Sequence, residues 1–403
     1  MSLVLNTNIN SMVAQNSLQS SGLQLSSALQ QLSSGLRINT AADDAAGFAI
    51  AQGMTSQING LGQAAQNAND GVSLTQTASG AMSEITNDLQ TMRDLAVESL
   101  NATNSSNDRA DLNAQFSQLA ADINNVAANT QFNGVNLLDG SFQGADFQIG
   151  ANAGQIISVS SIASASTTAI GNFYTTAAAT GAYAGTSANK GDTVSFDVTV
   201  GSNAQITTGA ITLTGNQTTD LKNVASAINE AIGSSDGIVA TVNAAGTGID
   251  LSTATGAAQT VTVAVDAGST FASNTLTQNG LGLDASYTLG SAAGTAKNLS
   301  NTDVTSVDHS NLVLISVDNA LQQLATSSAQ LGAYQNRFQA AISGLNTTAT
   351  NLSNAKSAIV DTNYAQATSN LSKAQILQQA GTSMVAQANT IPQNILTLLQ
   401  KLP

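Results

Sequence analysis

The stretch "LQSSGLQLSSALQQLSSGLRINTAADDAAG" (Leu18–Gly47) joins two kinds of sequence that together decide the fold. Nothing before Arg37 carries a formal side-chain charge, and apolar or small residues recur at alternating steps of four and three. These residues are Leu18, Gly22, Leu25, Leu29, Leu32 and Leu36. Such spacing is typical of a helix that packs lengthwise against another helix. Arg37, Asp43 and Asp44 then follow within eight residues, so a charge-free helix ends in a charged corner.

The charged corner has a catalytic and a structural interpretation. Acid–base catalysis would need a substrate pocket and perturbed carboxylates, and the sequence offers neither a glycine-rich phosphate loop nor a metal cluster. In the structural interpretation, the first helix ends at about Leu36 and Asn39 or Thr40 caps a second one. Asp43 and Asp44 then lie near the positive end of that second helix. We expect a structural corner or subunit contact, in which Arg37 pairs with a carboxylate of its own or a neighbouring chain.

The composition favours assembly over nucleic-acid or membrane binding. The chain has 403 residues, enough for two to four domains, and 42% of them are hydrophobic. Only 8% are charged, against about 25% in ordinary soluble domains. A neutral polar surface can pack against another copy without burying unpaired charge. The net charge of −14 leaves no basic patch for phosphates or anionic lipids, so we expect no nucleic-acid partner.

The residue inventory excludes several chemistries. The absence of cysteine excludes disulfides, thiolate metal sites and cysteine nucleophiles. His309 is the one histidine, and we expect it to be a solvated side chain in the turn-rich stretch "NTDVTSVDHSNL". We therefore expect no catalytic residue, cofactor or metal. The N-terminus lacks the basic and apolar regions of a cleavable signal, and no apolar run is long enough to span a bilayer.

The C-terminal end carries a second seam of the same kind. Its residues are Leu377, Gly381, Met384, Ala388, Ile391, Ile395, Leu398 and Leu402, and Pro392 predicts a kink within it. We expect the two ends to pack together and bury both seams. Further stripes of apolar residues predict long helices at Asp43–Asn101, Asp108–Thr130 and Ser310–Lys356, the second capped at Asn107-Asp108.

In the middle of the chain the sequence pattern changes from helical spacing to turns and alternating residues. Asn133-Gly134 and Asp139-Gly140 are hairpin-turn dipeptides, and the residues from Phe142 to Ser160 alternate as strands do. One amphipathic helix, "TTDLKNVASAINEAIG", is predicted with Asp220 as its cap and Gly233 at its end. Strands are predicted at Thr193–Val200, Ala210–Leu213, Ile238–Val242 and Val261–Val265. The expected fold is mainly α at the two ends, an antiparallel bundle of long helices, with a β-hairpin and an inserted α+β or mostly β outer domain.

Several blocks of sequence resemble bacterial flagellin. They are "NTNINSMVAQNSL", "LSSGLRINTAADDAAGFAIA", "NANDGVSLTQTASGAM", "LQTMRDLAV", "NTQFNGVNLL" and "ILQQAGTSMVAQANTIPQNILTLL". The resemblance covers about residues 1–160 and 310–403. It implies a structural subunit of the flagellar filament used for swimming, exported unfolded through the flagellar type III apparatus to the cell exterior. It also implies three domains: an inner-tube domain of residues 1–42 and 361–403, a shell domain of 43–164 and 301–360, and an outer domain of 165–300.

The resemblance also implies partners and interface residues. The partners are further copies of the chain in a helical homopolymer, hook-associated and cap proteins, and an export chaperone at the C-terminal helix. The expected subunit-interface residues are Leu18, Leu25, Leu29, Leu32, Leu36, Arg37, Asp43, Asp44, Leu377, Met384, Ile391, Ile395 and Leu398. Arg93 and Leu95 resemble part of the stretch that a flagellin-sensing Toll-like receptor recognises. Thr91 and Gln115 stand where the well-recognised pattern has a basic and an acidic residue.

Two alternatives remain open from the sequence. A hook–filament junction protein shares the design of the terminal helices but assembles into one short ring, and its terminal blocks match less closely. An enzyme carried in the inserted domain is the other alternative. The single histidine excludes a zinc protease with a two-histidine motif.

Overall fold

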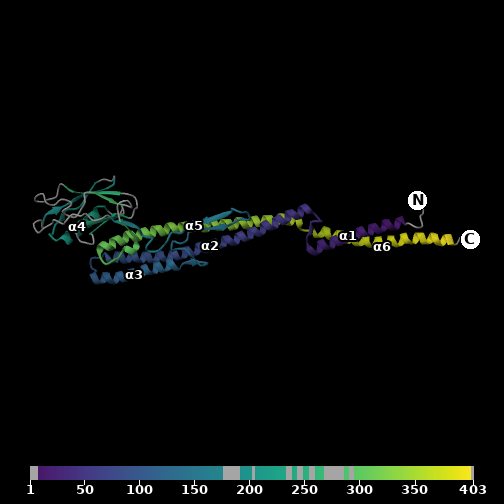
Figure 1. Ribbon diagram of the computed structural model, residues 1–403, viewed down its shortest axis with the longest axis horizontal. Coiled ribbons are helices and arrows are strands. Elements are labelled where there is room, and N and C mark those ends of the chain that lie inside the picture. The colour runs from purple at the N-terminus through teal and green to yellow at the C-terminus, as the bar shows by residue number, and fades with distance from the viewer. Residues whose placement is uncertain are drawn as a thin grey trace. The chain divides into compact units, whose positions relative to one another are not determined.

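The computed structural model describes residues 8–175, 191–201, 205–232, 238–242, 248–253, 259–266, 286–289 and 295–400, with side chains to residue 390 at the C-terminal end (Figure 1). The chain divides into two compact units. Unit 1 comprises residues 1–69, 148–157 and 339–403, and unit 2 comprises residues 70–147 and 158–338. The predicted division into three domains remains a prediction.

The helices occur where the apolar spacing predicts them. They are α1 (Ile9–Ser34), α2 (Ala45–Ser99), α3 (Ser106–Asn129), α4 (Gln217–Ile232), α5 (Val307–Val360) and α6 (Tyr364–Gln400). The strands are β1 (Gln131–Phe132), β2 (Val135–Asn136), β3 (Ala145–Gln148), β4 (Ile156–Val159), β5 (Phe173–Thr175), β6 (Thr193–Val194), β7 (Phe196–Val200), β8 (Ile206–Thr207), β9 (Ile211–Thr212), β10 (Ile238–Val242), β11 (Ile249–Thr253), β12 (Gln259–Val265), β13 (Ser286–Leu289) and β14 (Thr295–Lys297). The predicted class, helical at both ends with a strand-rich middle, is confirmed.

Three predicted helix caps are wrong, and each real cap lies a few residues away. Ser105, not Asn107-Asp108, caps α3 in a capping box whose other member is Asp108. Asn216 accepts from the Thr219 N–H at the start of α4, while Asp220 lies within the first turn. The predicted end of α4 at Gly233 lies outside the described residues. The third cap, at the start of α2, belongs to the corner described below.

Unit 2 contains a helical part in which α2 and α5 share a continuous apolar face. Met82, Ile85, Leu89 and Met92 on α2 are at most 1% exposed. On α5 the buried positions are Val313, Val317, Leu324, Leu331 and Phe338. The Phe338 ring fits over Gly71 of α2 and meets Phe147 edge to face, with ring centroids 5.2 Å apart. α3 adds Leu112, Phe116, Ile123 and Ala127 to the buried side chains.

The two Asx-Gly dipeptides differ in what they do. Asn133 and Gly134 both have positive φ (49° and 78°) and join the antiparallel pair β1–β2, as a two-residue hairpin turn requires. Asp139-Gly140 lies between β2 and β3, which do not pair with each other. Its carboxylate instead accepts hydrogen bonds from Ser141 and Asn136. The second hairpin prediction is therefore wrong.

The strand-rich part of unit 2 contains two four-stranded sheets, ordered β10-β11-β5-β14 and β13-β12-β7-β8. β6 pairs with β9, and β3 pairs with β4 in a separate two-stranded sheet. Helix α4 packs Leu221, Val224 and Ile228 into a core shared with both larger sheets, including Phe196 and Leu251. One amphipathic helix therefore supplies the central apolar surface for these short strands.

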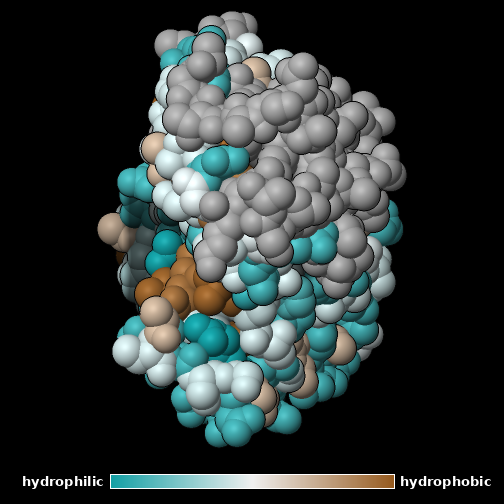
Figure 2. All heavy atoms as spheres, turned by 90° about the vertical axis from the view of Figure 1, so that its left-hand side faces the viewer, coloured by the Kyte–Doolittle hydropathy of each residue, from teal (hydrophilic) through white to brown (hydrophobic). Residues whose placement is uncertain are grey.

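In Figure 2 hydrophilic and near-neutral residues prevail, and one compact group of hydrophobic residues is exposed between them.

Pro392 lies inside α6, which continues beyond it to Gln400.

Candidate subunit interface

Helices α1 and α6 of unit 1 pack antiparallel along a face made largely of small residues. On α1 this face consists of Ser11, Ala14, Leu18, Ser21, Leu25, Ala28 and Leu32, all buried or half-buried. On α6 it consists of Ala367, Leu371, Ala374, Gln378, Gly381, Val385 and Ala388. A Cβ placed on Gly381 would lie 3.1 Å from Leu18 Cδ1, so the two backbones are close. The N-terminal end of α1 is attached to α6 by Asn8 Nδ2, which donates to the Ala388 carbonyl at 2.8 Å.

Several other large apolar side chains of these helices lie outside this face and are exposed. Ile9, Met12, Val13, Leu23, Ile376 and Met384 are each at least 55% exposed. Beside them runs a groove of about 560 Å³ whose lining includes Val13, Ala14, Ser17, Leu377, Ala380 and Met384. Groups of exposed apolar side chains commonly mark surfaces of contact with another molecule.

The predicted pairing of the two ends is confirmed, but the prediction that it buries both seams is wrong. Leu29 is 50%, Leu377 40% and Met384 63% exposed. Leu18, Leu25, Leu32 and Leu36 are half-buried, and Ile391, Ile395 and Leu398 lie in α6 with side chains outside the described residues. The physical reason is that helices approach most closely where their facing side chains are small. The two helices therefore meet through positions that carry many serine, alanine and glycine residues. Leu29, Leu377 and Met384 stay exposed beside that contact.

The corner after α1 joins α1 to the end of α5. Gly35 adopts a left-handed conformation (φ 74°) and ends α1 with its N–H bonded to the Gln31 carbonyl. Leu36 then pairs with Asp361 as an antiparallel bridge. Arg37 N–H donates to the Val360 carbonyl at 2.6 Å, and Thr362 N–H donates to the Gly35 carbonyl at 2.9 Å.

The Arg37 side chain acts on this same junction. Its guanidinium donates to the Ile359 carbonyl in the last turn of α5. A cation at this end satisfies a carbonyl that has no partner in its own helix, and it complements the negative end of the helix dipole. The predicted pairing with a carboxylate of the same chain is therefore wrong for the described residues. The role of Arg37 in a contact between subunits stays a prediction.

The carboxylates of Asp43 and Asp44 both accept hydrogen bonds from backbone N–H groups. The Asp43 carboxylate accepts from Thr40 N at 2.9 Å and Asn39 N at 3.0 Å, and these bonds hold its pKa below the ordinary value. Asp44 accepts from the backbone N–H groups of the first turn of α2, at 3.1 and 3.0 Å. Asp44 thus caps α2, and the predicted cap at Asn39 or Thr40 is wrong. Both carboxylates shape the corner.

Arg93 and Leu95 lie on α2 in unit 2 with different exposures. Arg93 Nε is 2.8 Å from Asp318 Oδ1 on α5, and both side chains are about half exposed. The hydrogen bond and charge of Asp318 raise the pKa of Arg93. Leu95 is buried, with 8% of its surface exposed. Arg93 is accessible on this face and Leu95 is not.

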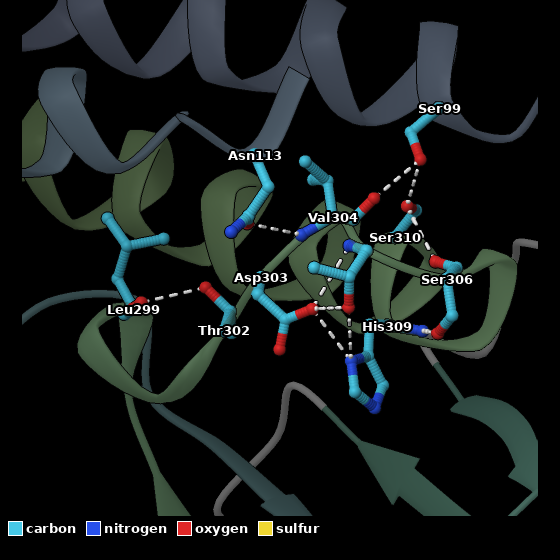
Figure 3. A network of polar contacts seen from close by, with 10 residues as sticks. Ser99, Asn113, Leu299, Thr302, Asp303, Val304, Ser306, His309 and Ser310 are labelled. Atoms are coloured by element: carbon cyan, nitrogen blue, oxygen red, sulfur yellow. Dashed lines mark hydrogen bonds and ion pairs between the residues drawn. The ribbon is translucent and has the colours of Figure 1, made fainter. Parts of the chain in front are cut away.

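His309 does not lie in a solvated loop. It belongs to the first turn of α5, is half-buried, and places Nδ1 2.8 Å from Asp303 Oδ1 (Figure 3). Its own N–H is bonded to Ser306 Oγ at the start of the helix. The hydrogen bond to Asp303 raises the pKa of His309, and the same bond holds the pKa of Asp303 well below its usual range. The cap at Ser306 explains the error, because it starts α5 before the histidine.

Among the described residues, no group of three or more histidine or carboxylate side chains could hold a metal ion. In that same part of the chain, none of the helices has the length and apolar character needed to cross a bilayer.

The fold and these surfaces together define a class: a chain whose two ends pair as antiparallel helices, whose middle is strand-rich, and whose terminal helices expose apolar faces. Comparisons with known proteins specify the family. The bacterial flagellin N-terminal helical region matches residues 5–143, and the bacterial flagellin C-terminal helical region matches residues 314–399.

Relatives match along the whole chain. A B-type flagellin of Pseudomonas aeruginosa is 34% identical, and flagellin B of Vibrio cholerae is 37% identical. In both comparisons 99% of this chain and 100% of the relative are covered. A solved structure of FliC from Burkholderia pseudomallei is 23% identical over 66% of this chain and 99% of its own, with a TM-score of 0.38. The chain belongs to the bacterial flagellin family.

Proposed function

We propose that this flagellin polymerises into the bacterial flagellar filament through the exposed apolar faces of α1 and α6. The full-length similarity to flagellins supports a filament subunit over a hook–filament junction protein. The observation that supports the proposal is that each terminal helix has one face packed within the chain and another face that is apolar and exposed. Small residues and half-buried leucines hold α1 to α6 within one chain, and other large side chains such as Leu23 and Ile376 remain uncovered. Burying each large apolar side chain stabilises an interface by about 1.5–3 kcal/mol.

The remaining roles follow from the same proposal. Residues 1–42 and 361–403 form the inner tube, residues 43–164 and 301–360 form the shell, and residues 165–300 face outward. The chain is exported through the flagellar type III apparatus and works outside the cell. The α6 face, apolar before assembly, is where an export chaperone binds. Arg93 offers a contact to a flagellin-sensing receptor. The protein acts as a structural subunit without catalytic activity, which its membership of a structural family supports.

Charge substitutions on the exposed face test the proposal. Ile376→Glu places a carboxylate where the proposal buries an isoleucine between subunits, and Gln375→Glu adds the same charge to the neighbouring exposed position. A buried unpaired charge is costly, so Ile376→Glu should abolish seeded polymerisation at wild-type concentrations. Gln375→Glu should assemble with at most a few-fold higher critical concentration. Electron microscopy and sedimentation measure both.

Circular dichroism of the monomers must show equal helix content in the two variants. Normal filaments from Ile376→Glu would refute the proposed interface. Loss of assembly in both variants to the same degree would show that net charge, and not the apolar face, controls polymerisation.

A further inference from the structure

The β1–β2 hairpin carries an exposed asparagine that is followed directly by glycine. Asn133 and Gly134 are the two central residues of the turn, between the paired residues Phe132 and Val135. Both central residues are exposed to solvent. The side-chain amide carbon of an asparagine can react with the backbone nitrogen of the next residue, and a glycine hinders that nitrogen least. The turn therefore holds the two groups of an intramolecular reaction next to each other.

Neither reacting group is held by a hydrogen bond. In a two-residue hairpin the ladder bonds join the flanking residues, here Phe132 and Val135, and leave the N–H of the second central residue out of the ladder. Among the described residues, no hydrogen bond is formed by the Asn133 side chain or by the Gly134 N–H. A Cβ placed on Gly134 would meet no atom within 4 Å beyond its chain neighbours. Water and base therefore have access to the Gly134 nitrogen.

Rotation of one peptide group brings the two groups together. Positive φ at both central residues (49° and 78°) makes this a type I′ turn. A type II′ turn joins the same strands with positive φ at the first central residue and a ψ there of about −120°. At that ψ the Gly134 nitrogen is eclipsed with Cβ of Asn133 and lies against its Cγ. The peptide between Asn133 and Gly134 is the one that rotates.

The rotated turn is a minor state that the hairpin can reach without opening. A type II′ turn favours glycine at its first central position, so Asn133, which carries a Cβ, adopts it less readily than the type I′ turn. Gly134 accepts either sign of φ, because it has no Cβ. The rotation lies beyond the last ladder pair, Phe132 and Val135, so β1 and β2 stay paired. The population of this minor state controls how fast the two groups react.

We propose that Asn133 is a site of spontaneous deamidation, at which the chain closes a succinimide ring with Gly134 and then opens it to aspartate or isoaspartate. The Gly134 nitrogen loses its proton to water or hydroxide, and its electron pair forms a bond to Asn133 Cγ. The bond from Cγ to Nδ2 breaks, and this nitrogen leaves as ammonia after it takes up a proton. Water then opens the ring at Cγ, which gives aspartate, or at the backbone carbonyl carbon, which gives isoaspartate. The balance is one water consumed and one ammonia released.

A second asparagine–glycine pair has a backbone that prevents the same reaction. Asn59 is exposed like Asn133, but Gly60 lies in the interior of α2. There a backbone N–H is bonded to the carbonyl four residues earlier, and the helical ψ keeps the nitrogen away from the preceding side chain. The pair Asn59-Gly60 is thus an internal control of equal sequence. Asn279-Gly280 lies outside the described residues.

The neighbouring aspartate–glycine pair is held by its side chain. The Asp139 carboxylate accepts from the Ser141 N–H and from Asn136 Nδ2, both at 2.8 Å. The hydrogen bonds from Ser141 and Asn136 hold the pKa of Asp139 below its ordinary value, so this carboxyl is ionised at neutral pH. An ionised carboxylate is a poor electrophile. We therefore expect no ring closure at Asp139-Gly140.

Isoaspartate at the turn will weaken the hairpin. It adds one carbon to the backbone between two strands of two residues each, so the short ladder has little pairing with which to absorb the change. The Leu137 N–H, just after β2, donates to the Thr130 carbonyl at 3.0 Å, and the Leu137 side chain is fully buried. The amide of Leu137 therefore reports on how well the hairpin is held.

Peptide mapping of the full-length monomer, kept in mildly alkaline buffer, tests the site. A parallel sample in concentrated urea gives the rate of each pair in the unfolded chain. Relative to that rate, we expect conversion at Asn133 to be about tenfold faster than at Asn59 or more, because α2 must open locally before Gly60 can react. The rate at Asn133 should rise with pH, since the attacking nitrogen must lose its proton. Folded-state conversion at Asn133 no faster than at Asn59 would overturn the proposal.

Two variants separate the reaction from its effect on the hairpin. Asn133→Gly keeps a residue that accepts positive φ but has no amide, and it should show no mass change at the turn. Asn133→Asp has the charge of the product with an ordinary backbone. Hydrogen exchange at Leu137 should be several-fold faster in the purified isoaspartate form than in Asn133→Asp. A mass change at the turn of Asn133→Gly, or equal exchange in these last two proteins, would contradict the proposal.

Discussion

At the scale of single residues, several of the charged side chains of this flagellin stabilise helix ends. Arg37 donates to the last turn of α5, and Asp44 accepts from the first turn of α2. Arg109 donates to the carbonyls of Ser99 and Asn101 at 2.8 and 3.1 Å where α2 ends. Each places a charge of favourable sign at a helix terminus, where backbone groups lack partners. The corner that first resembles a catalytic cluster is built from these caps.

Substitution of Arg37 tests this role. Arg37→Glu replaces a cation by an anion at the C-terminal end of α5, which reverses a contribution of about 0.3–1 kcal/mol. We expect the critical concentration for polymerisation to rise several-fold, while Arg37→Lys, which keeps the charge but not the planar guanidinium, has a smaller effect. Seeded growth at matched concentrations measures this. Equal growth of wild type and Arg37→Glu would show that the cap does not matter to assembly.

At the scale of elements, close packing between helices depends on small residues at chosen positions. Gly71 of α2 faces the Phe338 ring of α5, and a Cβ there would lie 2.5 Å from Phe338 Cζ. The ring cannot readily withdraw, because Phe147 meets it edge to face. Gly80, two and a half turns further along the same helix, has no atom within 4 Å of such a Cβ.

These two glycines form a matched pair for stability measurements. Gly71→Ala should lower the free energy of unfolding by about 1–3 kcal/mol, because overpacking displaces the ring. Gly80→Ala should raise it by about 0.5–1 kcal/mol, because alanine loses less backbone entropy in a helix. Urea denaturation of the monomer, followed by circular dichroism, measures both. Equal effects of the same sign would show that the packing around Phe338 adjusts freely.

At the scale of the whole molecule, stability is distributed unevenly between the two units. Unit 2 has cores of large side chains between α2 and α5 and around α4. The α1–α6 pair in unit 1 buries mainly alanine, serine and glycine, which contribute little hydrophobic free energy. In the proposed assembly, exposed side chains such as Leu23 and Ile376 become buried when another copy covers them. Isolated helices gain most of their stability from such packing.

Limited proteolysis compares the two states. In the monomer we expect a protease to trim the residues of Met1–Leu36 and those after about Asn363, leaving a resistant remainder. In the filament the same segments should resist digestion, because the Leu23 and Ile376 faces are covered. Mass spectrometry of the fragments locates the cuts. Equal resistance of the ends in monomer and filament would contradict the proposed assembly surface.

The sequence predicted most elements because their apolar periodicity is strong. Helix α2 begins and ends within two residues of its predicted bounds, and β10 (Ile238–Val242) matches its prediction. Caps were less predictable. Asn107-Asp108 and Ser105 both offer capping side chains, and the choice depends on which backbone donors lie within reach. The environment of His309 could not be predicted, because its partner Asp303 lies in the preceding segment and its burial comes from other elements.

The sequence by itself determined the helical ends, the strand-rich middle and the flagellin resemblance, because periodicity and local motifs are properties of the chain alone. Only the tertiary structure decided which face of each terminal helix is used within the subunit. Leu18, Leu25 and Leu32 can form a seam with Ser21 and Ala28 on one flank or with Gly22 and Leu29 on the other, since both sets keep steps of three and four. The close approach of α6 at Gly381 selects the smaller flank and leaves Leu29 exposed for another molecule.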